Sequence, residues 1–379
     1  MMKRYFYTAF VLLLVAVGAK AQSAREIQLN IKCPASRSGI GLELVSIKWS
    51  TLLAKNASLI SREFVVVDQN GAELPYQLEY KGSTEVQNLL VPLTVAAGKS
   101  IMLKIRPGKP APIVPKVYGR SVPERKDDFA WENDRIAFRM YGKALESTNE
   151  NAYGIDVWAK RTDKMILDKW YKTGDYHADH GDGLDYYSVG FTLGAGDIAP
   201  YVGEQIGFSK NYRKWKILDN GPLRFSFQLD YDEWQVAGMP VRVTKIYTLD
   251  AGSQLNRVDA TFHFSNKENM LPIVVGIVKR KEPGVISMVD QSGIISYWEP
   301  EHGVDGILGV GTITLQNSVS IETDTHLLQK AVAKNGVSLS YYTGAAWNKA
   351  GVITNAEEWL NYLQAFKKTI TSPLIINIK

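Results

Sequence analysis

Short segments with alternating apolar and polar residues recur along nearly the whole chain, and they constrain its fold more than any other feature. Before residue 107 they include REIQLNIK, REFVVVDQ and SIMLKIRPG, and after residue 129 they include RIAFRMYG, VRVTKIYTL and RVDATFHFS. A period of two is typical of β-strands, and the Gly, Asn, Asp and Pro residues between the segments indicate turns. The sequence therefore predicts an all-β protein with few helices.

Two β regions are predicted, separated by a proline-rich stretch. Residues 22–107 are interpreted as a small N-terminal β-sandwich, and residues 108–128 as an extended linker with little hydrophobic periodicity. Residues 129–379 contain so many strand-like segments that they predict a large sandwich or paired sheets. Residues 355–368 are predicted to be helical, because Asn355 and Glu358 form a start resembling a capping box and apolar residues recur on one face.

The N-terminus predicts export. A basic start at Lys3 and Arg4 precedes an apolar run, and Ala19, Lys20 and Ala21 follow in the small-x-small pattern that signal peptidase cleaves. Residues 1–21 are therefore interpreted as a signal peptide, and a periplasmic or secreted location is expected. No later stretch is long and apolar enough to predict a membrane helix, so no membrane attachment is expected after cleavage.

Charge and cysteine content exclude two further classes of protein, namely nucleic-acid-binding proteins with a broad basic surface and proteins stabilised by internal disulfides. Removal of the signal peptide lowers the formal net charge from +5 to +2, which leaves no broad basic surface for nucleic acid. The single cysteine, Cys33, cannot form an internal disulfide, so stability is expected to come from packing. An anionic ligand would have to be recognised by a local group of residues.

The segment DYHADHGDGLDYYSVG, residues 175–190, holds two of the five histidines in the chain. Its glycines oppose a regular helix, so it predicts a loop that displays polar side chains. His177 or His180 is the preferred general acid or base, because imidazole titrates near neutral pH and a neighbouring aspartate can fix its tautomer. Asp185 and Tyr187 are further catalytic candidates, and Tyr176 is a candidate for substrate binding.

Other interpretations of this loop stay open. Asp179, Asp182 and Asp185 could ligate calcium, although their spacing does not match an EF-hand. The two histidines with an aspartate could bind zinc, but no HExxH motif accompanies them. The third alternative is purely structural, with aspartates forming turns and histidines bonded to the backbone. No cofactor is expected, with calcium as the exception that this loop allows.

Aromatic and charged residues in three other segments could complete a site. In YWEPEHG, Trp298 offers a stacking surface for a sugar ring, with Glu299 and His302 beside it. In DDFAWENDRIAFRMYG, Arg135 or Arg139 could pair bidentately with a uronate carboxylate or, alternatively, with an internal acid. The remaining substrate-binding candidates are Trp131 and Trp347, and the possible anion contacts are Lys279 and Arg280.

The segments DDFAWENDRIAFRMYG, GIDVWAKR, DKWY, YHADHGDGLDYYSVG, ISYWEP and YYTGAAW together resemble an uncharacterised secreted family. That family is catalogued as a domain of unknown function and is common in polysaccharide-degrading bacteria. The resemblance covers most of the mature chain and implies a context of enzymes that dismantle uronate-rich glycans. The C-terminal part is similar to the galactose-mutarotase-like supersandwich, a fold that hosts mutarotases, lyases and glycoside hydrolases. The resemblance carries over no catalytic residues.

The preferred hypothesis is a carbohydrate-active enzyme that acts on an acidic, uronate-containing oligo- or polysaccharide. A lyase needs a base, a cation and a proton donor, which the histidines, an arginine and the tyrosines could supply. A glycoside hydrolase needs paired carboxyl groups, for which Asp185 with Glu299 or Glu301 are candidates. The alternatives are a non-catalytic glycan-binding protein with an exposed strip of tryptophans, or a sugar mutarotase or epimerase.

Overall fold

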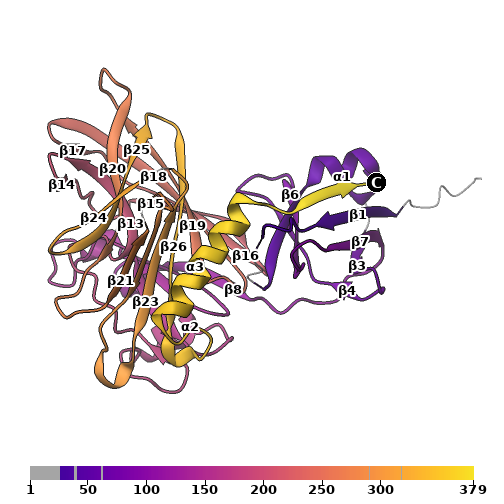
Figure 1. Cartoon of the computed structure of the whole chain (residues 1–379), viewed down its shortest axis with the longest axis horizontal. Helices are drawn as coiled ribbons and strands as arrows, with labels where there is room; N and C mark the ends of the chain where they lie inside the picture. The colour runs from indigo at the N-terminus through magenta and orange to yellow at the C-terminus, as the bar shows by residue number, and fades with distance from the viewer. Residues whose placement is uncertain (1–25, 38–40, 61–62, 290, 317) are drawn as a thin grey trace, which may run out of the picture.

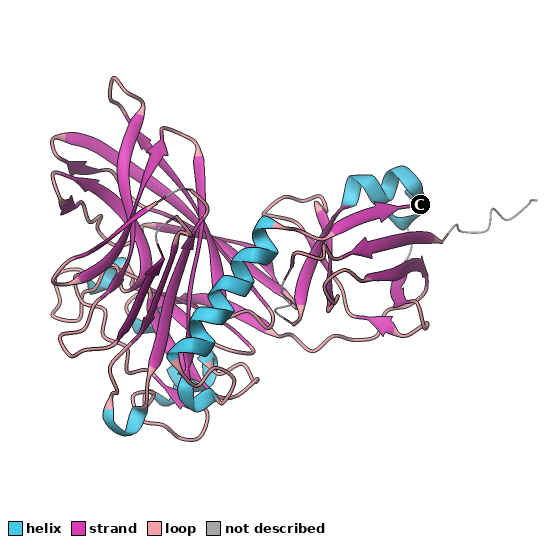
Figure 2. Ribbon diagram, viewed as in Figure 1, coloured by secondary structure: helices cyan, strands magenta, loops and turns pink. Residues whose placement is uncertain are grey.

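The structure is a computed structural model that describes residues 26–37, 41–60, 63–289, 291–316 and 318–379. The predicted signal peptide lies outside the described residues. The model consists mainly of antiparallel strands, which confirms the predicted all-β class (Figures 1 and 2). None of the helices in the described part of the chain has the length and apolar character needed to span a bilayer.

The smaller part of the molecule is built from two sheets around a core of aliphatic side chains, Trp49 and Phe64 (Figure 1). The first sheet contains, in order, β27 (Ile375–Ile378), β1 (Ile27–Lys32), β7 (Ser100–Pro107), β3 (Phe64–Asp68) and β4 (Glu73–Leu74). The second contains β2 (Glu43–Lys48), β6 (Asn88–Leu93) and β5 (Gln77–Glu79). Helix α1 (Trp49–Lys55) follows β2 and buries Trp49 and Leu52.

The predicted domain boundaries are wrong at two places. The last strand, β27, belongs to the predicted C-terminal region 129–379 but pairs with β1 of the smaller part. The reason is that its isoleucines cover the same core as the N-terminal strands. The predicted linker 108–128 also contains a strand, β8 (Val117–Val122), which pairs with β9 (Asp128–Asn133). Only the residues before β8 form an extended connection.

The larger part contains three sheets around one extensive core. The first runs in the order β12 (Gly183–Leu184), β11 (Asp156–Lys160), β10 (Ala137–Met140), β9 and β8. The second contains β14 (Gln205–Ile206), β13 (Ala195–Val202), β20 (Met270–Val278), β25 (His326–Lys334) and β24 (Val319–Glu322). The third contains β15 (Lys214–Asn220), β16 (Arg224–Asp230), β18 (Met239–Asp250), β19 (Leu255–Phe264), β26 (Ser338–Trp347), β23 (Leu308–Thr314), β22 (Ile294–Trp298) and β21 (Val285–Val289), with β17 (Trp234–Val236) paired to β18.

Both faces of the sheet β8–β12 are buried. Along β9, Phe129 and Trp131 point into the main core, whereas Ala130 points to a second cluster that α2 (Leu167–Thr173) covers. Successive residues of a strand face opposite sides, so Asp128 and Glu132 share the face of Ala130. The face beneath α2 is therefore lined with charged as well as apolar groups.

The predicted C-terminal helix is confirmed as α3 (Ala356–Thr371), which runs a little further than the sequence suggested. The side chain of Asn355 accepts a hydrogen bond from the Glu358 amide at 2.9 Å, and Glu358 in turn accepts from the Thr354 amide. This reciprocal arrangement satisfies amides that the first helical turn leaves open. Trp359 and Leu363 of α3 pack on β22 and β23, and Trp298 lies in the same cluster.

Candidate functional site

Three aspartates and one arginine meet at one end of the sheet β8–β12. Asp128 begins β9, Asp156 begins β11, and Asp185 directly follows β12. Because neighbouring strands are antiparallel, these positions and the C-terminal end of β10 lie at the same end of the sheet. Arg139 of β10 pairs directly opposite Asp156. Strand register alone therefore gathers the four side chains.

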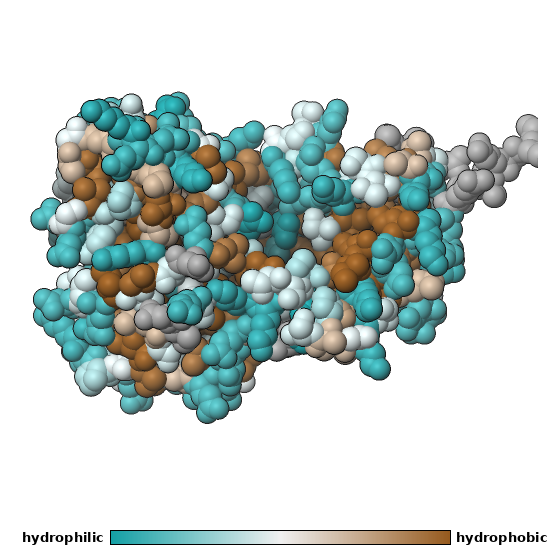
Figure 3. Space-filling view, turned by 45° about the horizontal axis from the view of Figure 1, so that its top comes forward, coloured by the Kyte–Doolittle hydropathy of each residue, from teal (hydrophilic) through white to brown (hydrophobic). Residues whose placement is uncertain are grey.

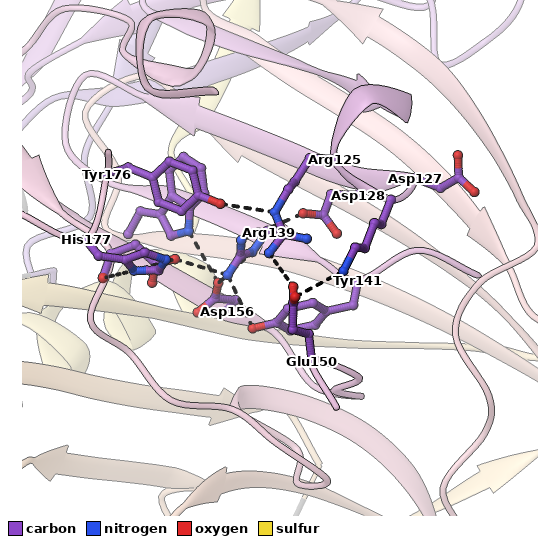
Figure 4. Close-up of polar contacts among 12 residues, drawn as sticks. Arg125, Asp127, Asp128, Arg139, Tyr141, Glu150, Asp156, Tyr176 and His177 are labelled. Carbon is purple, nitrogen blue, oxygen red and sulfur yellow. Dashed lines mark hydrogen bonds and ion pairs between the residues drawn. The ribbon is translucent and has the colours of Figure 1, made fainter. Parts of the chain in front are cut away.

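Arg139 is the centre of this group, as Figure 4 shows. Its Nε atom donates to Oδ2 of Asp156 at 2.8 Å, and its Nη2 atom donates to Oδ2 of Asp185 at 3.1 Å and forms an ion pair with Asp156 at 2.6 Å. Its Nη1 atom is 3.7 Å from Asp128, and its guanidinium lies over the ring of Tyr141. Arg139 thus pairs with internal acids, which was the alternative interpretation, and it is not free to bind a substrate carboxylate as expected.

Burial raises the pKa of all three aspartates. Desolvation raises the pKa of Asp128 to about 7 and that of Asp185 well above its usual value, in both cases against the attraction of Arg139. The pKa of Asp156 is also raised by burial. Neither carboxylate oxygen of Asp128 has a hydrogen-bond partner among the described residues. Arg139, with a smaller contribution from Arg125, does not balance three buried carboxylates, so the group retains protons near neutral pH.

Asp128→Asn is expected to become more stable relative to the natural protein as the pH rises. The carboxyl has a pKa of about 7 in the folded protein and 3.8 in a model peptide, so the folded state binds this proton when the unfolded chain has lost it. Its stabilising contribution is complete below about pH 4 and is lost as the pH rises to about 7. The free energy of unfolding that this carboxyl contributes at low pH and loses at high pH is up to about 4 kcal/mol.

Urea unfolding of both proteins between pH 4 and pH 8 measures this difference. Asp232→Asn serves as the control, because that aspartate is 71% exposed. A constant difference between Asp128→Asn and the natural protein over this range would show that Asp128 ionises normally in the fold.

His177 lies at the solvent-facing rim of the aspartate group. Its Nδ1 atom is 2.8 Å from the main-chain oxygen of Asp185 and 3.8 Å from Oδ2 of the same residue, and its ring lies against Tyr176. The side chain is 65% exposed. The bond to a carbonyl oxygen requires the proton on Nδ1, so Nε2 of the neutral ring has a free lone pair.

His180 does not join this group. It is exposed and its Nε2 atom lies 2.9 Å from Asp175, another surface residue. The neighbouring aspartates are also occupied: Asp179 pairs with Arg161 at 2.7 Å and Asp182 with Lys169 at 2.5 Å. The three aspartates proposed for calcium thus have three different cationic partners, which removes the geometric basis for that alternative. The described ranges contain no group of three His, Cys, Asp or Glu side chains that could hold a metal ion.

A second carboxyl group, Glu299, is buried beside Arg280. The Arg280 Nε atom donates to Oε1 of Glu299 at 2.8 Å, and its Nη1 atom donates to the Ser188 carbonyl at 2.6 Å. Burial raises the pKa of Glu299 to about 7, against the opposing attraction of Arg280. An exposed imidazole lies nearby: His302 stacks on Tyr186 with ring centres 5.0 Å apart, and its Nδ1 atom is 3.0 Å from Asp305.

The segment Asp185–Tyr187 connects the two groups. Asp185 contacts Arg139, whereas the Tyr187 ring lies beneath the Arg280 guanidinium at 4.5 Å. Burial raises the pKa of Tyr187, and the charges of Glu299 and Asp156 raise it further. The buried hydroxyls of Tyr186 and Tyr187 have no partner within the described residues. The candidate site is this connected set, with two buried carboxyls below two exposed imidazoles.

The predicted tryptophan platform is wrong. Trp131 is fully buried and donates to Asn256, and Trp298 is buried beneath α3. Trp347 is buried and donates to the carbonyl of Asp305 at 2.8 Å. Strand alternation could not reveal this, because both faces of the strands that carry these residues are covered.

Two other substrate-binding candidates have different positions from those expected. Arg135 lies in the exposed turn between β9 and β10, at the opposite end of the sheet from Asp128, so it does not join the site. Tyr176 is buried, stacks on Trp158 with ring centres 4.9 Å apart, and receives a hydrogen bond from Arg125 at 3.2 Å. Tyr176 thus supports the site from below and does not face a ligand.

Sequence reasoning missed Asp128, Asp156 and Arg125. The alternation in DFAWEN, with Asp128 and Glu132 on one face and Phe129 and Trp131 on the other, was the available signal for a charged buried face. Asp156 had no local signal, because its importance depends on the register that places it opposite Arg139.

Comparisons with known proteins identify relatives and fold neighbours. A family model described as Domain of unknown function (DUF4861) matches residues 38–376. An "Uncharacterized protein P7" from Formosa agariphila is 29% identical over 343 residues, which cover 85% of this chain and 82% of that protein.

Two solved structures from Enterococcus faecalis share the fold. An alpha-mannosidase from strain V583 aligns with a TM-score of 0.51 at 11% identity, and a protein in glycosyl hydrolase family 38 aligns with a TM-score of 0.55 at 10% identity. Each alignment covers 93% of this chain but only 46% and 47% of the respective structure, so the chain spans less than half of those proteins.

Proposed function

The chain belongs to the family described as Domain of unknown function (DUF4861), and we propose that it cleaves a uronate-containing glycan by β-elimination at the site around Asp185. In this reaction a base removes the proton next to the uronate carboxylate, a double bond forms, and an acid protonates the departing sugar oxygen. The observation that carries the proposal is the imidazole of His177, which is 65% exposed and whose Nδ1 atom is held by the main-chain oxygen of Asp185.

His177 is the proposed base. Its Nδ1 contact with the Asp185 carbonyl selects the tautomer with a free Nε2, and the exposed ring can reach a substrate without a rearrangement of the fold. A hydrolase of the usual two-carboxylate type would instead need an ionised acid as base or nucleophile. Burial raises the pKa of both Asp185 and Glu299, which favours the imidazole for this role.

Glu299 is the proposed proton donor. With a pKa of about 7, its carboxyl is largely protonated in mildly acidic solution and can regain its proton after each turnover. Arg280 orients the carboxyl through Oε1. The half-buried Tyr186 ring stacks on the exposed imidazole of His302 near this carboxyl.

Arg125 supports the choice of an acidic substrate. It donates a hydrogen bond to the hydroxyl of Tyr176, the residue directly before the proposed base His177. The Arg125 side chain is 29% exposed. Its Nη2 atom pairs with Glu150 at 2.7 Å, and its buried Nη1 atom has no hydrogen-bond partner among the described residues. A uronate carboxylate that displaces the exposed Glu150 would pair with this guanidinium next to the base, which would stabilise the charge that develops on proton removal. Such substrates are outside the cell, consistent with the predicted export signal.

Hydrolysis is the second candidate, and the two fold neighbours named as an alpha-mannosidase and a glycosyl hydrolase family 38 protein favour it. In that reaction Glu299 would keep its role as acid. The products separate the alternatives, since only elimination leaves an unsaturated sugar.

Glu299→Gln is expected to lower turnover by about 10²–10⁴-fold, because glutamine cannot donate the proton. In the natural protein, kcat should fall as the pH rises above about 7, where Glu299 loses its proton. Turnover measured from pH 5 to pH 9 on uronate-containing oligosaccharides tests both points. Glu301→Gln, an exposed neighbour, is the matched control. A variant with natural turnover and an unchanged pH profile would exclude Glu299 as the acid.

A further inference from the structure

A cavity of about 540 Å³ lies between the smaller and larger parts of the molecule. Its walls come from β2 and β5 on one side, from β16, β18, β19 and β26 on the other, and from α3. Hydrophilic residues are visible at the junction of the two parts in Figure 3. The volume is in the range of roughly 300–1,000 Å³ typical of small-molecule sites, and interfaces between folded units are common places for them. None of the lining residues belongs to the candidate site around Asp185.

The floor of this cavity is a row of side chains across the large sheet. Strand register aligns Ser226, Thr248, Arg257 and Tyr342 on four adjacent strands. Their side chains share the outer face of the sheet, because their immediate neighbours Phe227, Tyr247, Val258 and Tyr341 are buried in the core on the opposite face. Hydroxyl groups, a guanidinium and an aromatic ring thus form one continuous polar strip.

The centre of the strip is accessible to a ligand. The Arg257 side chain is 50% exposed and pairs with Asp259 at 2.8 Å, which holds the guanidinium in place. On the wall beside it, Phe366 of α3 meets the Tyr342 ring edge-on with ring centres 5.3 Å apart. Both rings are half-buried, so each has a surface towards the cavity that a sugar ring can contact.

The cavity is preformed, because direct bonds tie its two sides together. Gln77 of β5 accepts from the amides of Leu223 and Arg224, and the Arg224 guanidinium pairs with Glu79 at 2.7 Å. At a second point Asp219 accepts from the amides of Tyr80 and Lys81. These bonds fix the spacing of the walls, so a ligand would not have to order them on binding.

Charges of both signs line the cavity in nearly equal number. The acidic residues are Glu43, Glu79, Asp250 and Asp259, and the basic residues are Lys81, Arg224 and Arg257. This balance opposes a polyanion, whereas carboxylates that accept from hydroxyls, arginines that donate to them and flanking aromatic rings suit a neutral sugar. We propose that the cavity is a second, non-catalytic binding site for a short neutral oligosaccharide, centred on Arg257 and Tyr342.

Isothermal titration of the full mature chain with four probes tests this proposal: cellotriose, xylotriose, mannotriose and trigalacturonate. At least one neutral trisaccharide should bind, and Arg257→Ala and Tyr342→Leu should each raise its Kd at least tenfold. The matched control is Arg242→Ala, an exposed arginine on the same outer face of β18 and about 20 Å along the strand from Thr248. The Kd of the Arg242→Ala variant for the neutral trisaccharide should equal that of the natural protein.

Three results would overturn the proposal: no binding by any neutral probe, neutral binding that survives both substitutions, or trigalacturonate binding that the two substitutions weaken more than they weaken neutral binding. Only binding that Arg257→Ala and Tyr342→Leu weaken is assigned to the cavity, so uronate bound or cleaved at the site around Asp185 does not affect the outcome. Thermal unfolding of each variant verifies that it is folded.

Discussion

Replacing His177 with alanine is expected to lower turnover on a uronate-containing oligosaccharide by about 10²–10⁴-fold, the usual contribution of a positioned base. The melting temperature should stay close to that of the natural protein. The side chain is 65% exposed and contributes one hydrogen bond, to the Asp185 carbonyl, which water can replace at the surface. Turnover and thermal unfolding are measured on the same preparation.

His180→Ala is the control for this experiment. His180 belongs to the same loop and is exposed to a similar degree, but it contacts only the surface residue Asp175. It should retain natural turnover. Equal losses in both variants would indicate a general effect on the loop, and full activity in His177→Ala would exclude this residue as the base.

Arg139→Met is expected to destabilise the protein by about 3–5 kcal/mol, the cost of removing one partner from a buried ion pair. Methionine fills a similar volume, but it leaves Asp156 and Asp185 without the guanidinium that contacts both. Protonation relieves the unpaired carboxylates, so the loss should be larger at pH 8 than at pH 5. Urea unfolding at the two pH values measures it.

Arg135→Met is the matched control, since Arg135 occupies an exposed turn of the same sheet. The free energy of unfolding of this variant should be within about 0.5 kcal/mol of that of the natural protein. A small, pH-independent effect of Arg139→Met would show that the three aspartates do not depend on this arginine.

Local patterns were sufficient to predict strands and helix ends. The period-two alternation in RIAFRMYG corresponds to β10, and Asn355 caps the helix at the expected residue. These features depend on residues close in sequence. The pairing of β27 with β1 could not be predicted, because it joins the two ends of the chain through a shared apolar core.

The candidate site was only partly predictable for a related reason. The loop 175–190 was identified by composition, but the difference between His177 and His180 depends on which of them lies near Asp185. Trp131 and Trp298 were mistaken for ligand-binding residues because the sequence does not show that their strands are covered on both faces. In the case of Trp298, the cover is a helix distant in sequence. Burial on a second face depends on tertiary packing, which alternation does not encode.

The burial of these tryptophans also weakens the alternative of a non-catalytic binding protein with a flat aromatic strip at this site. Trp131, Trp298 and Trp347 have almost no exposed surface. What the surface offers near Asp185 is two imidazoles above buried acids, which suits proton transfer better than stacking.

Analysis of the products formed from a uronate-containing oligosaccharide, by mass spectrometry and ultraviolet absorbance, tests the proposed function most directly. β-Elimination predicts two fragments whose masses add up to that of the substrate, one of them with an absorbing double bond conjugated to the carboxylate, and it predicts that His177→Ala forms neither at a comparable rate. Fragments that together contain one additional water would indicate hydrolysis and contradict elimination, and intact substrate after incubation with the natural protein would contradict glycan cleavage altogether.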